Sequence, residues 1–170
     1  RASEVSGINE GLFGQADERI GFKEMISAAE KVYTGDILPP DSDDYISTAN
    51  LFAFQAKIIK ELAQQESCII LGRCGNYLLD GGDGVLRVFI HAPLESRIAR
   101  VASYSLAWSE REVARYIRVE DKRRAAYYHY YTGEEWRDAG AYDICLDSEK
   151  LGEDGCVQRI MQVLPLYSAK

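Results

Sequence analysis

The chain of 170 residues carries 20 lysines and arginines against 27 aspartates and glutamates, which gives a formal net charge of −7. This length predicts one domain with a sizeable core, which we expect to span residues 1–170. The acidic charge argues against general binding to nucleic-acid polymers. No apolar run approaches the roughly 18 residues of a membrane span and no signal peptide is visible, so we expect a cytoplasmic protein without membrane or nucleic-acid partners.

The four cysteines are also consistent with a cytoplasmic protein. Cys68, Cys74, Cys145 and Cys156 show no C-x-x-C pair and no histidine at metal-binding spacing. Two of them, Cys68 and Cys145, lie in apolar, strand-like runs, which favours buried, reduced thiols over disulfides. We therefore predict no metal site from these residues.

Three helices are predicted in the first 65 residues. They run from a capping Asn9 to about Asp17, from Phe22 to Tyr33, and from Asp43 or Asp44 to about Gln65. The segment Gly35–Asp44, with two prolines and four aspartates, is typical of an exposed loop.

A buried strand is predicted next, at Cys68–Leu71, because four apolar residues in a row fit a strand covered on both faces. Gly72 ends the run and permits a tight turn. Arg73 would then sit at the carboxyl end of a central strand, the edge where open α/β sheets bind ligands. Its guanidinium could then bind a phosphate or a planar base. The alternative to a ligand-binding role is that Arg73 is a surface arginine just past a strand.

The remaining chain alternates helices and strands. The predicted elements are a short helix at Asn76–Leu79, a buried strand at Val85–His91, a helix from Pro93 to a break around Ser103–Trp108, a helix from the capping box at Ser109 to about Tyr131, a strand at Asp143–Asp147 and a closing helix at Gly155–Leu166. This order predicts an α/β protein whose parallel strands are joined by right-handed crossovers.

One broad face of the helix from Ser109 carries Arg118, Asp121 and Arg124. In a binding site the arginines would hold a phosphate, while Asp121 would accept hydrogen bonds from a sugar hydroxyl or a base amine. The alternative is a surface ladder of ion pairs, in which each pair contributes only about 0.3–0.5 kcal/mol.

Basic residues also flank the predicted break between two helices. Arg97 and Arg100 follow a strand, and Arg111 and Arg115 lie beyond the break. Two helices with a short hinge could form a mobile lid over a phosphate chain. The alternative is a solvated pair of basic helices.

An aromatic cluster, Tyr127–Tyr131 followed by Trp136, closes the long helix. Such a cluster is usually core packing with the hydroxyls reaching outward, which is the interpretation we favour. Stacking on a base is the alternative.

Taken together, these residues resemble the cytidylate kinase-like family of P-loop nucleotide kinases. The matching segments are 69–74, 88–98, 121–128, 130–133 with Trp136, 142–147 and 150–152, and they cover most of the chain from about Ala56 onward. The resemblance implies a helix-rich, three-layer α/β/α P-loop fold with a parallel sheet and a lid at about residues 97–118. It also implies transfer of the γ-phosphoryl group of ATP, with Mg²⁺, to CMP or a related nucleoside monophosphate, so that small nucleotides are the expected partners.

The resemblance also assigns roles to single residues. Arg73 matches a glycine-arginine pair that contacts the monophosphate, and Asp121 and Arg124 match a pair that holds its sugar and its phosphate or base. Arg97 and Arg100 match the basic residues that open the lid. The loop after the last strand, which lies near the adenine of ATP in this family, is matched by Asp147, Lys150 and Gly152.

The sequence departs from the family pattern in two places. Cytidylate kinases have an aspartate where this chain has Cys74, which leaves the preference for cytidine open. The chain also has no glycine-rich loop ending in Gly-Lys-Ser/Thr, and the cluster Gly81–Gly84 lacks lysine and leads into a strand. We expect the first strand and the phosphate loop to lie upstream of Arg1, since a chain without them would be inactive.

Two rival functions remain open from the sequence. The first is a non-catalytic nucleotide-binding or regulatory protein on the same fold. The second is a different P-loop transferase that acts on a small phosphorylated metabolite. The oligomeric state does not follow from the sequence.

Overall fold

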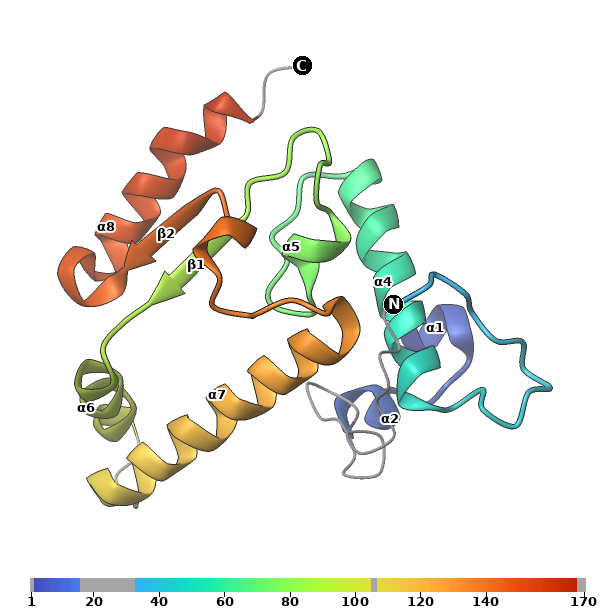
Figure 1. Ribbon diagram of the computed structural model, residues 1–170, viewed down its shortest axis with the longest axis horizontal. Helices are drawn as coiled ribbons and strands as arrows, with labels where there is room; N and C mark the ends of the chain where they lie inside the picture. The colour runs from blue at the N-terminus through green and yellow to red at the C-terminus, as the bar shows by residue number, and fades with distance from the viewer. Residues whose placement is uncertain (1, 16–32, 105–106, 168–170) are drawn as a thin grey trace. The chain divides into compact units, whose positions relative to one another are not determined.

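The computed structural model describes residues 2–15, 33–104 and 107–167 (Figure 1). Two compact units are formed, one by Arg1–Leu79 with Arg123–Trp136 and the other by Asp80–Lys122 with Arg137–Lys170. The protein is helix-rich α/β, and the single domain that we expect stays a prediction. Apart from Tyr33, the predicted helix Phe22–Tyr33 lies outside the described residues.

Among the described residues, the first unit begins with α1 (Ala2–Ser6), α2 (Glu10–Gln15) and α4 (Thr48–Gln65). The predicted cap of α2 is confirmed, because the Gly11 N–H donates to Asn9 Oδ1 at 2.8 Å. The start of α4 at Asp43 or Asp44 is wrong. Turns occupy residues 40–46, and the helix begins only where the Ser47 side chain accepts the Asn50 N–H.

Aromatic rings fill the main core of the first unit. Phe52 of α4 is 2% exposed and stacks on Tyr131 with the ring centroids 3.8 Å apart. Tyr131 lies near the end of α7 (Glu110–Thr132), and its hydroxyl donates to the Thr48 carbonyl at 3.1 Å. The favoured interpretation of the tyrosine cluster as core packing is therefore confirmed, since the rings are buried and the hydroxyls reach polar partners.

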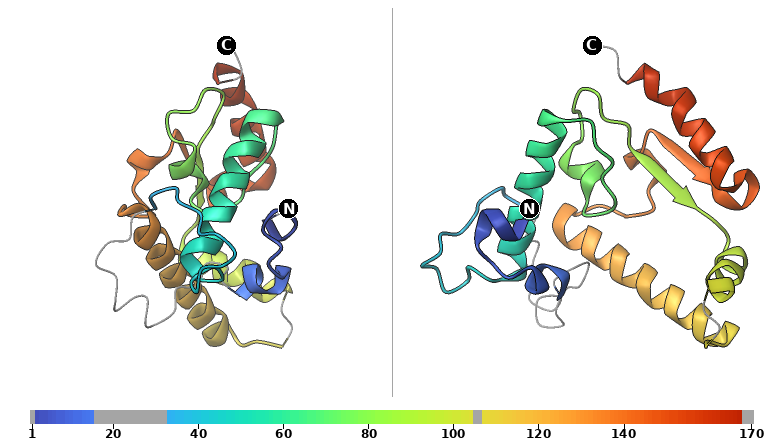
Figure 2. Two further views of the ribbon diagram at one scale, coloured as in Figure 1. Left: turned by 90° about the vertical axis from the view of Figure 1, so that its right-hand side faces the viewer. Right: turned by 180° about the vertical axis from the view of Figure 1, so that it is seen from behind.

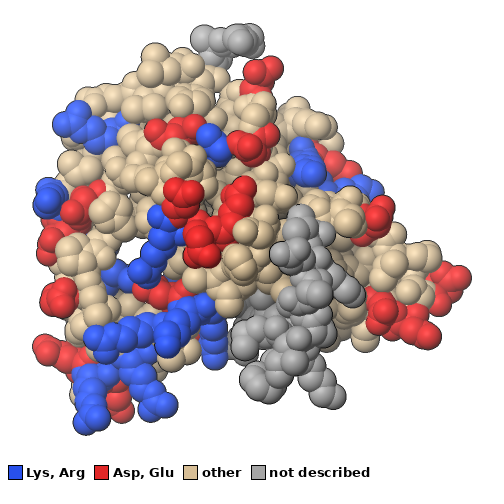
Figure 3. Space-filling view, viewed as in Figure 1, with Lys and Arg blue, Asp and Glu red and all other residues tan. Residues whose placement is uncertain are grey.

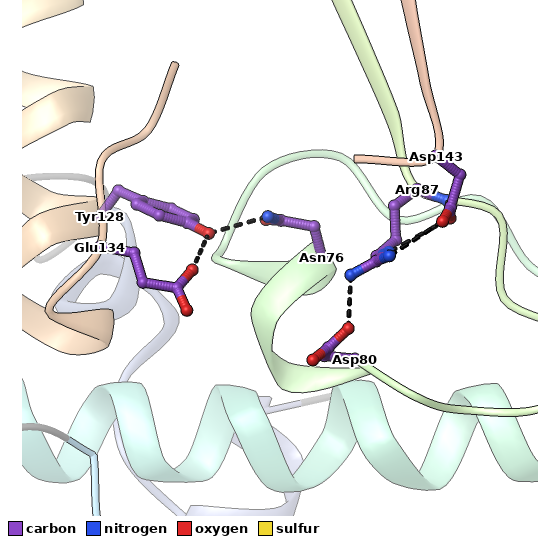
Figure 4. A network of polar contacts seen from close by, with 6 residues as sticks. All are labelled: Asn76, Asp80, Arg87, Tyr128, Glu134 and Asp143. Carbon is purple, nitrogen blue, oxygen red and sulfur yellow. Dashed lines mark hydrogen bonds and ion pairs between the residues drawn. The ribbon is translucent and has the colours of Figure 1, made fainter. Parts of the chain in front are cut away.

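A polar network ties α5 (Gly75–Leu78) to the end of α7 (Figure 4). The Tyr128 hydroxyl accepts a hydrogen bond from Asn76 Nδ2 at 2.8 Å and donates one to Glu134 Oε2 at 3.1 Å. The Tyr128 ring is only 3% exposed, so this network satisfies a phenol that would otherwise be buried without a partner.

The predicted buried strand at Cys68–Leu71 is wrong. The segment is irregular, and Ile69 and Leu71 are 91% and 84% exposed. A strand exists only when a neighbour accepts and donates its backbone hydrogen bonds, and the described residues offer none to this segment. The turn after it does form, and Gly72 leads into it with a φ of 69°.

The second unit contains a two-stranded parallel sheet of β1 (Val88–His91) and β2 (Ile144–Asp147), with Val88 opposite Ile144. The parallel pairing confirms the predicted α/β character. The sheet is packed against α8 (Ser148–Val163), as Figures 1 and 2 show. The expectation that the first of these strands is buried is wrong, because Val88 and Phe89 are half-buried and Ile90 and His91 are exposed, Ile90 to 53%.

A helix follows each strand. After β1 comes α6 (Leu94–Tyr104), and after β2 comes α8, which begins at Ser148 rather than at the predicted Gly155. The second unit also contains the first half of α7 and the 3₁₀ turns Ala139–Ala141 and Leu164–Leu166. The capping box of α7 is confirmed, since the Ser109 N–H donates to Glu112 Oε2 at 2.8 Å and the Glu112 N–H donates back to Ser109 Oγ. Within the described ranges, no helix is long and apolar enough to cross a membrane.

An arginine and two aspartates join the starts of the two strands (Figure 4). Arg87 donates from its backbone N–H and from Nη2 to the Asp143 carboxylate, at 2.7 and 2.9 Å, and its Nη1 pairs with Asp80. The Asp143 N–H donates to the Arg87 carbonyl at 2.9 Å. These bonds lie one residue before the first ladder pair, so they help to fix the register of β1 on β2.

Candidate functional site

The carboxyl edge of the parallel sheet positions the candidate site. After β1 ends at His91, α6 begins at Leu94, and the Arg97 N–H donates to the Pro93 carbonyl at 3.1 Å. Arg97 therefore lies in the first turn of the helix that follows β1. This is the edge at which open α/β sheets bind ligands.

Two arginines meet at one carboxylate beside this edge. Arg97 donates from Nη1 and Nη2 to the two oxygens of Asp121, each at 2.7 Å, and Arg137 Nη2 donates to Oδ2, also at 2.7 Å. The Asp121 side chain is 14% exposed, that of Arg97 is 29% and that of Arg137 is 63%. All three belong to the second unit. We call them the arginine–aspartate cluster.

Asp121 further stabilises the charged form of Arg97, whose guanidinium is protonated at any physiological pH. The hydrogen bond from Arg97 to Asp121 raises the pKa of the guanidinium, and it outweighs the burial that would lower that pKa. Arg97 is therefore a cation whose position is fixed, because its two terminal nitrogens each donate to one oxygen of Asp121. Such a pair of guanidinium groups around one oxyanion is also the arrangement that suits a phosphate group.

The structure brings together two of the predicted site residues, Arg97 and Asp121, and adds Arg137. Arg137 could not be predicted from the sequence, because it lies 16 positions from Asp121, beyond the end of α7, where helical periodicity gives no signal. Its place directly after Trp136 of the aromatic cluster is the only local hint. In this structure Asp121 holds arginines, and its predicted contact with a sugar or base stays a prediction.

Arg73 lies in the first unit, in the turn before α5. Its φ is 57° and that of Cys74 is 55°, so two non-glycine residues adopt the left-handed region in succession. This region is uncommon for such residues and often marks a functional turn. Other contacts engage the half-buried side chain, although its Nη1 atom is buried without a hydrogen bond among the described residues.

The other predicted arginines take different places. Arg124 lies on α7 in the first unit, where other interactions engage it, so its convergence with Arg73 and Asp121 stays a prediction. Arg100 is half-buried on α6, and Arg118 is exposed on α7. Neither forms an ion pair with another residue of the described ranges.

The predicted adenine-side residues surround the start of α8. Asp147 caps this helix by accepting the Glu149 N–H at 3.0 Å, and Lys150 is exposed. Gly152 interrupts the helix with φ 68° and ψ 177°, a conformation that favours glycine. Because Ser148 Oγ donates to the His91 carbonyl at 3.1 Å, this segment is tied to the same sheet edge from which α6 departs.

The cluster fits the phosphate groups of ATP better than it fits a bare metal ion. Two guanidinium groups around one carboxylate leave an excess positive charge, which suits an anion. In the part of the chain that the structure describes, no three acidic, histidine or cysteine side chains gather as metal ligands. Any Mg²⁺ would therefore be held together with the phosphates of a nucleotide.

The amino-acid sequence matches the model of a known protein family. The model of the cytidylate kinase-like family matches residues 1–150. Cytidylate kinase from Methanosarcina acetivorans is 31% identical over 87 residues, and that from Methanosarcina mazei is 30% identical over 87 residues. Each match covers 51% of this chain and 48% of the relative, so the chain spans about half the length of these curated relatives.

A solved structure shares the fold. It is an uncharacterized protein from Eubacterium ventriosum, with a TM-score of 0.68 and 23% identity over 97% of this chain and 88% of that chain. The resemblance that the sequence motifs indicated is thus confirmed by a match over most of the chain. The chain belongs to the cytidylate kinase-like family.

Proposed function

We propose that this protein is a nucleoside monophosphate kinase-like phosphotransferase, which transfers the γ-phosphoryl group of ATP to CMP or a related small acceptor. The observation that carries the proposal is the arginine–aspartate cluster at the carboxyl edge of the sheet, in a chain of this family. The two Methanosarcina relatives are named cytidylate kinases, which supports CMP as the first acceptor to test.

The proposed chemistry relies on positioning and charge. Phosphoryl transfer spreads negative charge over the transferred group, and fixed cations stabilise it. Arg97 is held in place before any ligand binds, so it loses little freedom on binding, and Arg137 offers a more exposed guanidinium beside it. Asp121 acts through them as a positioning residue. Mg²⁺ bound with ATP would neutralise phosphate charge.

The first unit would supply the residues that bind the acceptor nucleotide. Arg73 is the residue that we propose to contact the monophosphate, and Arg124 would support it. Asp147, Lys150 and Gly152 would border the adenine of ATP. These roles come from the family resemblance, and the strained turn at Arg73 supports the first of them.

The three-layer P-loop fold is part of this proposal. It requires a glycine-rich phosphate loop, which the sequence of 170 residues does not contain, and a strand before that loop, which the described residues do not form. We propose that residues upstream of Arg1 supply both. The large exposure of Ile69 and Leu71 supports the proposal, because a further strand would pair with Cys68–Leu71 and the helix after the phosphate loop could cover the face on which both side chains lie.

The test is an ADP-release assay on the protein encoded by the complete natural gene, with a panel of CMP, UMP, dCMP, AMP and GMP. We expect release that one pyrimidine monophosphate stimulates. Arg97→Ala should lower kcat at least about tenfold, since a charge-assisted contact contributes about 1.5–3 kcal/mol. The matched control is Arg159→Ala on α8, whose side chain is exposed and bonds only Gln162 among the described residues.

The regulatory rival has one observation in its favour, namely that residues 1–170 contain no glycine-rich phosphate loop. It predicts that the complete protein binds a nucleotide in calorimetry but releases no ADP with any acceptor. Absence of both binding and release would contradict the kinase proposal and the rival together.

A further inference from the structure

The two ends of α7 differ in composition and burial. Figure 3 shows lysine and arginine side chains gathered at the surface over the beginning of the helix, whereas residues 125–133 contain no lysine, arginine, aspartate or glutamate. Near the end of the helix, Tyr127, Tyr128 and Tyr131 are 5%, 3% and 3% exposed. Arg124 is the last arginine of α7 and lies one helical turn before Tyr128. The buried end of the helix therefore helps to fix the place of Arg124.

The position of Arg73 is linked in the same way to α5. Arg73 lies in the turn before this helix, three positions before Asn76. The Gly75 N–H closes the turn by donating to the Gly72 carbonyl at 3.0 Å. Because Arg73 lies within this closed turn, a shift of α5 would move Arg73 as well.

A hydrogen bond joins the two helices on which Arg73 and Arg124 depend. Asn76 Nδ2 donates to the Tyr128 hydroxyl at 2.8 Å (Figure 4). Apolar packing also holds α5 on α7, since Leu78 lies in the same core cluster as Tyr128, but such packing has no preferred direction. A hydrogen bond is strong only within narrow limits of distance and angle. This bond therefore sets which part of α7 lies beside α5, and with it the spacing of the two arginines.

The Tyr128 hydroxyl forms this bond with a defined polarity. Its proton is donated to Glu134 Oε2 at 3.1 Å, and an ionised carboxylate can only accept, so the phenol oxygen accepts from Asn76. Glu134 is itself held at the end of the helix, because its N–H donates to Thr132 Oγ1 at 3.0 Å. The hydroxyl of Thr132 donates in turn to the Tyr128 carbonyl at 2.7 Å. The network is therefore ordered before any ligand binds.

We propose that Tyr128 is a positioning residue for acceptor binding. Through Asn76, its hydroxyl holds Arg73 at the spacing from Arg124 at which both guanidinium groups can bind one nucleoside monophosphate. This inference rests on the proposed function, in which the two arginines bind the acceptor. Cations that are placed before binding lose less freedom when the ligand arrives. The alternative is a purely structural role, in which the network only satisfies a buried phenol.

Tyr131 provides a matched control that separates the two roles. It lies three positions after Tyr128 on the same helix, is also 3% exposed, and donates from its hydroxyl to the Thr48 carbonyl at 3.1 Å. Tyr128→Phe and Tyr131→Phe therefore each keep a buried ring and remove one hydroxyl. The first change removes the bond to α5, and the second removes a bond to α4. A purely structural loss should be similar in both variants.

The experiment is steady-state kinetics of the protein encoded by the complete natural gene, with ATP and CMP or the better acceptor of the panel. For Tyr128→Phe we expect KM for the acceptor to rise at least about tenfold, because a misplacement of about 1 Å can cost about 100-fold. KM for ATP should stay within about twofold in both variants, and Tyr131→Phe should also keep KM for the acceptor within about twofold. If the protein binds the monophosphate without releasing ADP, its dissociation constant from calorimetry replaces KM.

Asn76→Ala tests whether the effect passes through the bond to α5. It should raise KM for the acceptor about as much as Tyr128→Phe does, and the double variant should be no worse than either single variant, because both changes break one bond.

Hydrogen exchange gives a measure that does not depend on activity. The Leu78 and Leu79 N–H groups form backbone bonds of 2.9 and 3.1 Å at α5. Their exchange should be at least about threefold faster in Tyr128→Phe, because local opening of α5 becomes easier when its bond to α7 is lost. In Tyr131→Phe it should match the parent.

Three results would overturn this inference alone, provided that the parent binds or phosphorylates a monophosphate. They are equal changes of KM in Tyr128→Phe and Tyr131→Phe, additive effects of Asn76→Ala and Tyr128→Phe, and unchanged exchange at α5. A complete protein that neither binds a monophosphate nor releases ADP would overturn the proposed function and this inference together.

Discussion

Arg97 and Asp121, 24 positions apart, face each other in a bidentate ion pair whose two N–H···O bonds are each 2.7 Å long. Both side chains are largely withdrawn from water, and Arg137 adds a third bond to the same carboxylate. This geometry links α6 to α7 and places a fixed cation at the edge of the sheet. It makes the pair both a structural contact and the centre of the proposed site.

Asp121→Asn should destabilise the fold. The change leaves the charge of Arg97 without its counterion, and we expect the free energy of unfolding to fall by about 1.5–3 kcal/mol. Urea denaturation followed by circular dichroism measures it. The control is Asp83→Asn, an exposed aspartate without an ion pair in the described structure. Equal stability of the two variants would show that the bidentate pair does not stabilise the fold.

Protonation of Asp143 should account for part of the stability that the fold loses at acid pH. Hydrogen bonds from Arg87 lower the pKa of the Asp143 carboxyl, so the folded state holds this group ionised at a pH where the unfolded chain, with a pKa of about 3.9, takes up a proton. The resulting stability is present above about pH 4 and is lost as the pH falls through the lower, folded-state pKa.

Asp143→Asn tests this pH dependence. At about pH 7 the variant should be less stable by about 1.5–3 kcal/mol, and the difference from the parent should shrink as the pH falls below about 4. Denaturant titrations at a series of pH values measure it. A difference that stays constant down to about pH 2 would contradict the assignment of the pKa shift to Arg87.

Arg73→Gly should separate stability from binding. A left-handed backbone costs a non-glycine residue roughly 1–2 kcal/mol, which glycine avoids, so the variant should be at least as stable as the parent despite its lost side-chain contacts. If Arg73 contacts the acceptor phosphate, the affinity of the complete natural protein for CMP should fall at least about tenfold in calorimetry. A stable variant with unchanged affinity would remove Arg73 from the proposed site.

Local signals in the sequence predicted most of the helices well. The capping box at Ser109 and the cap at Asn9 depend on residues a few positions apart, and both form as expected. Pairing between distant segments was harder to predict. The apolar run at Cys68–Leu71 has the composition of a strand, but a strand also needs a neighbour, which composition does not reveal. Arg137 meets Asp121 through the fold alone, without any periodic signal.

The exposed segment gives the last prediction. Ile69 and Leu71 bury little surface within residues 1–170, so Ile69→Lys/Leu71→Lys should change the free energy of unfolding of this chain by less than about 0.5 kcal/mol. Phe52→Ala is the control for a buried site and should cost about 3–5 kcal/mol, because the ring is 2% exposed and stacks on Tyr131.

The same double substitution has a different expected result in the protein encoded by the complete gene. If upstream residues add a strand beside this segment and a helix over its face, both side chains become buried. Burying two lysines in place of two apolar residues should then cost several kcal/mol. A loss of free energy of unfolding in the longer protein alone would therefore indicate that upstream residues pack against Cys68–Leu71. Equal, small effects in both proteins would contradict that part of the proposed P-loop fold, and a large loss in residues 1–170 would contradict the exposed conformation of the segment.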